Sequence, residues 1–239
     1  MHLSETARKY FDTQAESRAR SRHRNRFYHS SLEAFIGFLV PRDSTVLHVG
    51  ADSSSLLNSL APKRGLGIHT SEKLVTEVAK QHATDSITFS STELSAVQGT
   101  FEYVIISDLL GHVEDIEALL REAAARVSWR GRIVVTQHNA LWGPLLRAAS
   151  ALGLRVPSRL ENWISRADLE NFGRLAGLEV VRSGTRMLLP KYVPLLSAFL
   201  NTYVANIFPF NHFGLYHYVV LRKQDARSPL SRNDRAHST

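Results

Sequence analysis

The stretch Thr45-Val-Leu-His-Val-Gly-Ala-Asp-Ser-Ser-Ser-Leu-Leu57 joins a short β-branched run to a helical pattern through a glycine. The run Thr45–Gly50 predicts a strand, and the pattern over Ser54–Leu60 predicts the helix that follows it. A strand, a tight turn and a helix in this order form the first part of a βαβ unit.

The same unit recurs along the chain. Further strand-like runs lie at Gly65–His69, Ile87–Ser91, Phe101–Asp108 and Arg132–Asn139, separated by helical patterns at Ser71–Gln81, Val113–Val127 and Leu141–Leu152. Tyr103–Ile106 is continuously apolar, which is typical of a strand covered on both faces. Alternation of this kind predicts a mainly parallel sheet with helices on both sides.

The pattern changes after Gly153. Ser165–Ala176 reads as a helix with Ser165 as its N-cap and Gly177 closing its end. Two further strands are predicted at Leu178–Leu189 and Tyr216–Lys223. The fold prediction is therefore a single Rossmann-like, doubly wound α/β domain with seven strands, the last one antiparallel, preceded by an N-terminal helical segment.

We divide the chain into a basic N-terminal helical extension (1–30), an α/β domain (31–223) and a tail expected to be disordered (224–239). An aromatic-rich insert, 190–214, interrupts the domain. The net charge of +7 comes from the two ends, because residues 31–221 contain equal numbers of acidic and basic side chains. A nucleic-acid-binding groove across the domain is therefore not expected.

Other compositional features exclude several classes of site. The chain has no cysteine, which excludes disulfides, thiolate zinc ligands and a cysteine nucleophile. No H-E-x-x-H or comparable spacing is present, so no metal site is expected. Neither a signal peptide nor a transmembrane segment is predicted, and we expect a cytoplasmic protein.

Three stretches resemble motifs of the class I S-adenosylmethionine (SAM)-dependent methyltransferases. Thr45–Leu57 is similar to motif I of that family, in which the first strand ends in an acid and leads into a G-x-G-x-G turn. Arg64–Ser71 resembles the family's second strand, and Phe101–His112 resembles the fourth strand with its following loop. The similarity covers roughly residues 20–222 and implies the same seven-stranded sheet.

The resemblance implies that SAM lies over the carboxyl ends of the strands, beside the first strand. A glycine turn lets the backbone approach the methionine end of SAM, and an acid after the second strand accepts hydrogen bonds from the ribose hydroxyls. The positions that match the cofactor-binding positions of the family are His48, Gly50, Ala51, Asp52, Ser53, His69, Thr70, Thr92, Glu93, Asp108 and Leu109.

Four positions depart from the family pattern. Asp52 and Ser54 stand where the second and third glycines of motif I would be. His48 replaces the acid that ends the first strand, and His69 replaces the ribose-binding acid. A histidine can donate a hydrogen bond to a ribose oxygen, but it cannot accept from two hydroxyls as a carboxylate can.

Catalytic candidates follow the fourth and fifth strands. Asp108, His112 and His138 lie at or just beyond carboxyl ends, where each could orient or deprotonate an acceptor. Asn139, Trp142 and Trp163 are candidates for an acceptor pocket. For each of these residues the alternative is a structural role, as a helix cap, a buried histidine or a core aromatic side chain.

The insert 190–214 contains Tyr192, Phe199, Tyr203, Phe208, Phe210 and Phe213. It is interpreted most simply as a helix packed on the sheet with an aromatic turn. Two alternatives remain open, a lid over the acceptor and a contact with a membrane surface, to which the basic N-terminus could contribute.

The leading functional hypothesis is a SAM-dependent methyltransferase that acts on a small molecule or a glycan, most readily at oxygen. Trp142-Gly-Pro and Glu161-Asn-Trp163 are similar to a bacterial subgroup associated with glycosyltransferases of polysaccharide biosynthesis. The alternative is a catalytically silent methyltransferase fold that serves as a partner or regulatory subunit, which the four departures motivate. Methylation of nucleic acid is a third hypothesis, against which the neutral domain counts.

Overall fold

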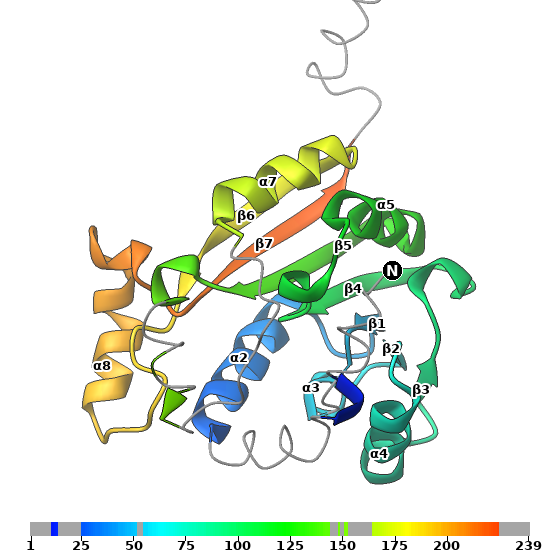
Figure 1. Cartoon of the computed structure of the whole chain (residues 1–239), viewed down its shortest axis with the longest axis horizontal. Helices are drawn as coiled ribbons and strands as arrows, with labels where there is room; N and C mark the ends of the chain where they lie inside the picture. The colour runs from blue at the N-terminus through cyan, green and yellow to red at the C-terminus, as the bar shows by residue number, and fades with distance from the viewer. Residues whose placement is uncertain are drawn as a thin grey trace, which may run out of the picture.

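The protein forms one seven-stranded sheet covered by helices (Figure 1). The structure, a computed structural model, describes residues 11–13, 25–51, 55–143, 148, 151–152 and 164–224. The strands are β1 (Thr45–Val49), β2 (Arg64–His69), β3 (Ile87–Ser91), β4 (Phe101–Ser107), β5 (Val127–His138), β6 (Leu178–Arg186) and β7 (Tyr216–Lys223). Their order is β3-β2-β1-β4-β5-β7-β6.

The predicted strand directions are confirmed. The five strands β1 to β5 pair in parallel, and β7 lies antiparallel between β5 and β6. In this arrangement the carboxyl ends of β1, β4 and β5 meet at one edge of the sheet, where an α/β fold places its ligands.

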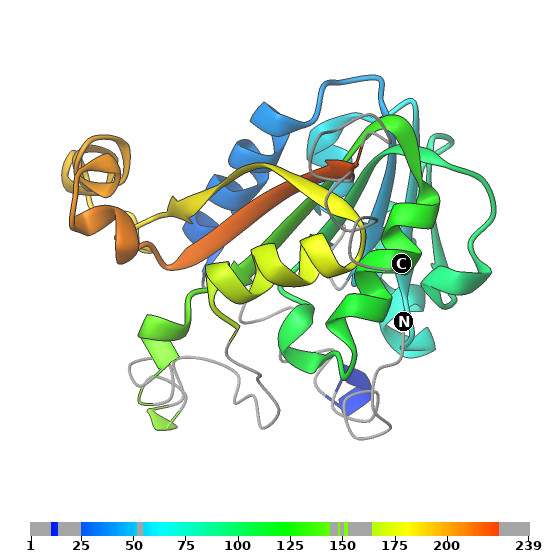
Figure 2. The ribbon, with the colours of Figure 1, turned by 90° about the horizontal axis from the view of Figure 1, so that it is seen from above.

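Helices cover both faces of the sheet (Figure 2). They are α2 (Arg26–Leu39), α3 (Ser55–Leu60), α4 (Glu72–His82), α5 (Ile116–Arg126), α7 (Arg166–Leu175) and α8 (Leu196–Thr202), with 3₁₀ turns η1 (Leu94–Ala96), η2 (Leu110–His112), η3 (Ala140–Trp142), η4 (Val204–Asn206) and η5 (Phe210–His212). One buried apolar cluster joins the sheet to α4, α5 and α7, and a second joins it to α2 and α3. The sheet is therefore doubly wound, as predicted.

Two strands differ in length from the prediction. β5 begins at Val127, and its pairing with β4 shifts by a bulge before Arg132. Gly131 permits this bulge, because a Cβ there would come within 2.4 Å of the carbonyl oxygen of Glu102. β6 ends at Arg186, because Met187 adopts a φ of +66° and turns the chain out of the sheet.

The N-terminal part of the domain also differs from the expected division. α2 runs across the boundary placed between residues 30 and 31, and buries Tyr28, Leu32 and Ile36 against the sheet. Most of the expected extension, most of the helix expected at Leu141–Leu152 and the tail 225–239 lie outside the described residues.

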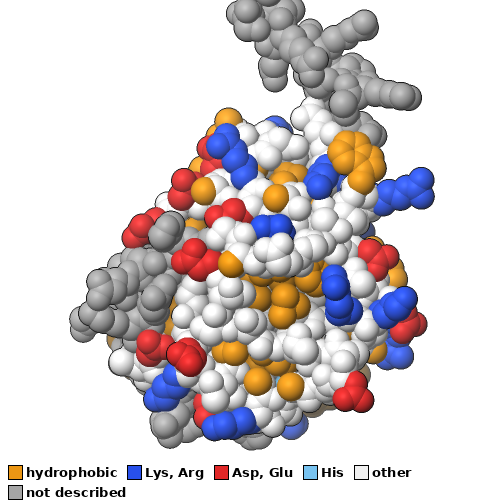
Figure 3. Space-filling view, turned by 90° about the vertical axis from the view of Figure 1, so that its right-hand side faces the viewer, with side chains coloured by type: hydrophobic (Ala, Val, Ile, Leu, Met, Phe, Trp, Pro, Cys, Tyr) orange, Lys and Arg blue, Asp and Glu red, His pale blue; other side chains and the backbone are white. Residues whose placement is uncertain are grey.

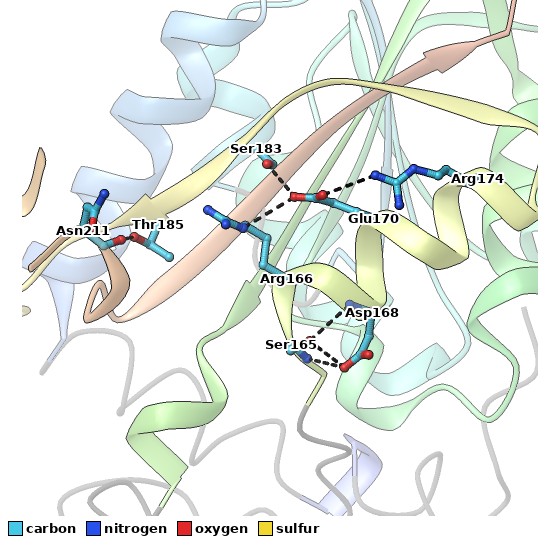
Figure 4. Close-up of polar contacts among 8 residues, drawn as sticks. All are labelled: Ser165, Arg166, Asp168, Glu170, Arg174, Ser183, Thr185 and Asn211. Carbon is cyan, nitrogen blue, oxygen red and sulfur yellow. Dashed lines mark hydrogen bonds and ion pairs between the residues drawn. The ribbon is translucent and has the colours of Figure 1, made fainter. Parts of the chain in front are cut away.

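The start of α7 is the capping box that the sequence indicates. The Ser165 hydroxyl accepts from the Asp168 amide at 3.1 Å, and the Asp168 carboxylate accepts from the Ser165 amide at 3.1 Å. Hydrogen bonds from Ser165 lower the pKa of Asp168. Glu170 then fixes the helix on β6 by accepting from Ser183 at 2.6 Å (Figure 4).

Loss of this cap should destabilise the domain measurably. Ser165→Ala is expected to lower the free energy of unfolding by about 1 kcal/mol, because the first turn of α7 loses its side-chain acceptor. Urea unfolding followed by circular dichroism measures the difference. Ser165→Thr, which keeps a hydroxyl at the cap, is the control and should recover most of the loss; equal losses in both variants would contradict this role of the hydroxyl.

Candidate functional site

Asp108 is the centre of a polar cluster at the carboxyl edge. It follows β4 directly and adopts a φ of +51°, a left-handed backbone conformation that residues other than glycine rarely take. Its carboxylate accepts a hydrogen bond from the Tyr28 hydroxyl at 3.0 Å and lies 3.2 Å from Nδ1 of His138. Helix α2 and strands β4 and β5 each contribute one member of this cluster.

The cluster holds Asp108 in its ionised form. Burial raises the pKa of its carboxyl group, but the charge of His138 and hydrogen bonds from His138 and Tyr28 outweigh burial. The net result is a pKa lowered to about 2. A permanent carboxylate beside an imidazole fixes the orientation of the ring.

His138 completes an arrangement suited to proton transfer. The Tyr28 ring stacks on the imidazole with centroids 5.5 Å apart, and the His138 side chain remains 20% exposed. Because Nδ1 faces Asp108, Nε2 is the nitrogen that can exchange a proton with a bound molecule. The pair Asp108–His138, hereafter the dyad, has the composition of an oriented general base.

A glycine turn lies beside the dyad at the end of β1. Gly50 adopts a φ of +81°, and a Cβ at this position would come within 3.1 Å of the Leu109 side chain. The Gly50 and Ala51 amides both donate to the carbonyl oxygen of Ile68, which keeps the turn against β2. The first glycine of motif I is therefore required by the local backbone.

The end of β2 differs from a carboxylate ribose site. His69 is fully buried, and its Nδ1 accepts from the Ser71 amide at 2.9 Å, so the ring proton lies on Nε2. The Phe11 ring packs edge-on against His69, with centroids 4.6 Å apart, and the neighbouring Asp12 hydrogen-bonds the Ser71 hydroxyl. The helical turn at residues 11–13, hereafter the N-terminal turn, thus covers the position where the family resemblance implies a ribose site.

These residues still fit a nucleoside, through a different donor set. The Thr70 hydroxyl is buried and has no hydrogen-bond partner in the structure, although it follows His69 directly. A buried hydroxyl without a partner is uncommon and indicates a group that completes it. Thr70, with the Nε2 proton of His69, can hydrogen-bond two ribose hydroxyls once Phe11 moves aside.

Two other predicted site histidines lie apart from the dyad. His48 is buried on β1 and contacts the Ser107 hydroxyl through Nε2 at 2.8 Å. His112 is buried in η2, where its ring packs against Phe11 with centroids 5.0 Å apart. His112 thus belongs with His69 under the N-terminal turn.

The predicted acceptor residues hold the insert in place. The Asn139 amide donates to the carbonyl oxygens of His212 and Gly214 and accepts from the Leu141 amide. The indole nitrogen of Trp142 donates to the carbonyl oxygen of Phe213 at 2.8 Å. Thr92 and Glu93 lie half-buried just after β3, while Asp52, Ser53 and Trp163 lie outside the described residues.

Three functional candidates were missed by the sequence analysis. Tyr28 is the first of the three buried residues of α2, and a buried phenol needs a hydrogen-bond partner. Gln137 and His217 face each other across the β5–β7 pair, both buried, and Oε1 of Gln137 and Nε2 of His217 have no hydrogen-bond partner. Burial and the charges on His138 and Arg166 lower the pKa of His217 to about 4. The sequence did contain one sign of Gln137, because two polar residues, Gln137 and His138, end the otherwise apolar strand β5.

A protein-family model described as a methyltransferase domain matches residues 20–183. The chain belongs to this methyltransferase family. The match spans the glycine turn, the second strand and the dyad. No curated protein matches the sequence.

Solved structures share the methyltransferase fold at low identity. One comes from the complex between the Haloferax volcanii Trm112 methyltransferase activator and a methyltransferase (18% identity, TM-score 0.68, 90% of this chain and 98% of that one). Another is the magnesium protoporphyrin IX methyltransferase of Synechocystis with bound S-adenosylhomocysteine (17% identity, TM-score 0.63, 91% of this chain and 97% of that one). A third is a SAM-dependent methyltransferase of Thermotoga maritima (15% identity, TM-score 0.67, 91% of this chain and 100% of that one). At these identities the likeness establishes the fold.

Within the described residues, no helix has the length and apolarity needed to cross a bilayer. The same residues contain no group of three side chains arranged to hold a metal ion.

The ionised state of Asp108 predicts a pH-dependent contribution to stability. Because its pKa is lower in the folded protein, the contribution is complete above about pH 4 and is lost as the pH falls towards 2. Wild type should therefore exceed Asp108→Asn in unfolding free energy by on the order of 2 kcal/mol near neutral pH. Urea unfolding over a pH series checks this.

The two proteins should become equally stable at the acidic end of that series. Glu93→Gln, which removes an acid from the same edge outside the dyad, is the control and should follow wild type at every pH. A difference between wild type and Asp108→Asn that does not change with pH would contradict the ionised dyad.

Proposed function

We propose that this protein is a SAM-dependent methyltransferase that deprotonates and methylates a hydroxyl group of a small molecule or glycan. The observation that carries the proposal is the dyad Asp108–His138, locked by Tyr28 beside the Gly50 turn. A strained residue whose carboxyl group has a strongly shifted pKa is typical of a functional site.

The residues have distinct roles in the proposed mechanism. The Gly50–Ala51 turn would receive the methionine end of SAM, and Thr70 with His69 would hydrogen-bond the ribose. When bound, SAM would supply an electrophilic methyl group. Nε2 of His138 accepts the proton of the acceptor hydroxyl, and the Asp108 carboxylate stabilises the resulting imidazolium. Tyr28 keeps Asp108 in position and shields the pair from water.

A glycan or another polyol is the acceptor class that the sequence resemblance to methyltransferases of polysaccharide pathways favours. Oε1 of Gln137 and Nε2 of His217 also lack partners, and His217 stays neutral near neutral pH. Gln137 precedes His138 directly on β5, so Gln137 and His217 point to the opposite face of the sheet from His138. The two groups are therefore not assigned to the acceptor of the dyad.

The first test is SAM binding to the purified full-length chain by isothermal calorimetry. Wild type is expected to bind in the micromolar to millimolar range, because the ribose is held without a carboxylate. His69→Asp should bind more tightly, since it restores an acceptor for both ribose hydroxyls. Thr70→Val, which removes the hydroxyl and keeps the side-chain shape, should weaken binding. Wild type without detectable binding at millimolar SAM would overturn the proposal.

A second test addresses the dyad. Once an acceptor is found, His138→Gln should lower kcat by about 10²- to 10⁴-fold while SAM affinity stays unchanged, because the ring acts on the acceptor proton. His82→Gln is the matched control, as α4 ends at the opposite edge of the sheet. Unchanged kcat in His138→Gln would remove His138 from the reaction.

The second candidate function is a silent methyltransferase fold acting as a partner subunit. It is favoured by His69 and by the burial of Phe11 over the ribose position. Structural relatives include a methyltransferase in complex with an activator protein, so a protein partner is a reasonable alternative to a cofactor. This candidate predicts no SAM binding by wild type together with a gain of binding in His69→Asp.

A further inference from the structure

Helix α8 hides its polar side and exposes its aromatic side. Ser197 is buried, and its hydroxyl donates to the carbonyl oxygen of Val193 at 2.9 Å. Asn201, one turn later, accepts from the Leu188 and Leu189 amides, each at 2.9 Å. Side chains two positions apart on a helix point in nearly opposite directions, so the residues between these two face away from the protein.

The opposite side of α8 carries the aromatic residues. Phe199 and Tyr203, also one turn apart, contact each other with ring centroids 5.9 Å apart and are 55% and 64% exposed. A surface helix of a globular protein normally buries its apolar side and shows its polar side to water. The expectation that this helix packs its aromatic residues on the sheet is therefore wrong.

The exposure extends over the whole insert. Its exposed large apolar side chains are Tyr192, Val193, Leu195, Leu196, Phe199, Tyr203, Ile207, Phe208, Phe210 and Phe213. We call this set the aromatic surface. Only six other large apolar side chains are as exposed in the described part of the chain. Figures 1 and 2 show the segment projecting from the β6–β7 end of the sheet. Such a concentration of exposed apolar groups marks an interaction surface.

The aromatic surface is held by specific contacts. Asn139 and Trp142 hydrogen-bond three carbonyl groups of the insert, and the Thr185 hydroxyl hydrogen-bonds the carbonyl oxygen of Asn211 (Figure 4). At its margin Tyr192 contacts Phe27 of α2, with ring centroids 5.7 Å apart. The backbone of the insert is therefore fixed to the rest of the domain by these contacts, while the aromatic surface stays exposed.

Charge identifies the kind of partner that fits. No Asp or Glu occurs between Glu179 and Asp225, and the insert carries one cation, Lys191. On the face of the molecule shown in Figure 3, by contrast, acidic and basic side chains are interspersed. A hollow of about 430 Å³ at its margin is lined by Arg26, Phe27, Ser30 and Tyr192. In the sequence, four more arginines alternate through residues 18–24 just before α2. Aromatic side chains with cations and without acids match an anionic lipid surface.

We propose that the aromatic surface of residues 190–214, with Lys191 and Arg26 at its margin, docks this protein on anionic membranes. α8 has seven residues, far fewer than the roughly 20 that a spanning helix needs, so the segment lies within the interface of one leaflet. Its phenylalanine and leucine side chains enter the boundary between headgroups and acyl chains. Docking of this kind requires no methyl transfer, so a failed enzyme assay leaves it in place.

Co-sedimentation of the full chain with vesicles tests this proposal. Vesicles of phosphatidylcholine alone are compared with vesicles that also contain phosphatidylglycerol. Wild type is expected to bind the anionic vesicles at least about tenfold more strongly, and the preference should shrink as salt is added. The double variant Phe199→Ser/Tyr203→Ser should lose about tenfold or more of the binding to anionic vesicles, because two inserted side chains are removed.

The matched control is Trp129→Ser. Trp129 is a similarly exposed aromatic residue near the start of β5, whereas the insert is attached beyond the end of that strand. Circular dichroism verifies that both variants fold, and Trp129→Ser should bind like wild type. Wild type that binds neither vesicle at low salt overturns the proposal, as does an equal loss in both variants. A stable dimer that the double variant dissociates, without vesicle binding, would instead assign the aromatic surface to a second copy of the chain.

Discussion

The contact between Asp108 and His138 organises the carboxyl edge of this domain. Asp108 adopts a left-handed conformation at the end of β4, and His138 and Tyr28 together lower the pKa of its carboxyl group to about 2. Tyr28 reaches the same carboxylate from α2, so the helix that opens the domain is tied to the two central strands. A left-handed backbone conformation costs stability, and such conformations cluster at functional sites.

Next to this cluster the cofactor edge is only partly of the family type. Gly50 keeps the positive φ that the turn requires. Histidines, however, stand at the ends of β1 and β2, where the family pattern has acids. Phe11 covers His69, and Thr70 leaves a buried hydroxyl without a partner. The proposed binding of ribose at this edge would therefore require the N-terminal turn to move away from His69. The same turn also packs on His112, so its displacement would expose both rings.

Periodicity predicted the sheet because its strands are short, β-branched and separated by capped helices. The antiparallel position of the last strand followed from the family resemblance. The bulge at Gly131 could not be predicted, since it depends on the approach of the Glu102 carbonyl oxygen from the neighbouring strand.

The sequence placed Asp108 and His138 at the same edge of the sheet but did not predict their contact with each other. Tyr28 was missed because it lies 80 residues before Asp108, so the local sequence gives no sign of which carboxylate its hydroxyl reaches. Asn139 and Trp142 were expected to face an acceptor, and their polar atoms instead hold the insert, a role that depends on backbone carbonyl groups far along the chain.

The central claim is that a nucleoside cofactor binds at the Gly50–Thr70 edge beside the dyad. Amide NMR spectra of the full chain, recorded while S-adenosylhomocysteine is added, test it most directly. The account predicts chemical-shift changes concentrated at the amides of Gly50, Ala51, Thr70 and Asp108. It also predicts loss of the nuclear Overhauser effects between the rings of Phe11 and His69. Spectra that stay unchanged at millimolar ligand, or shifts confined to residues away from this edge with Phe11 still in place, would contradict it.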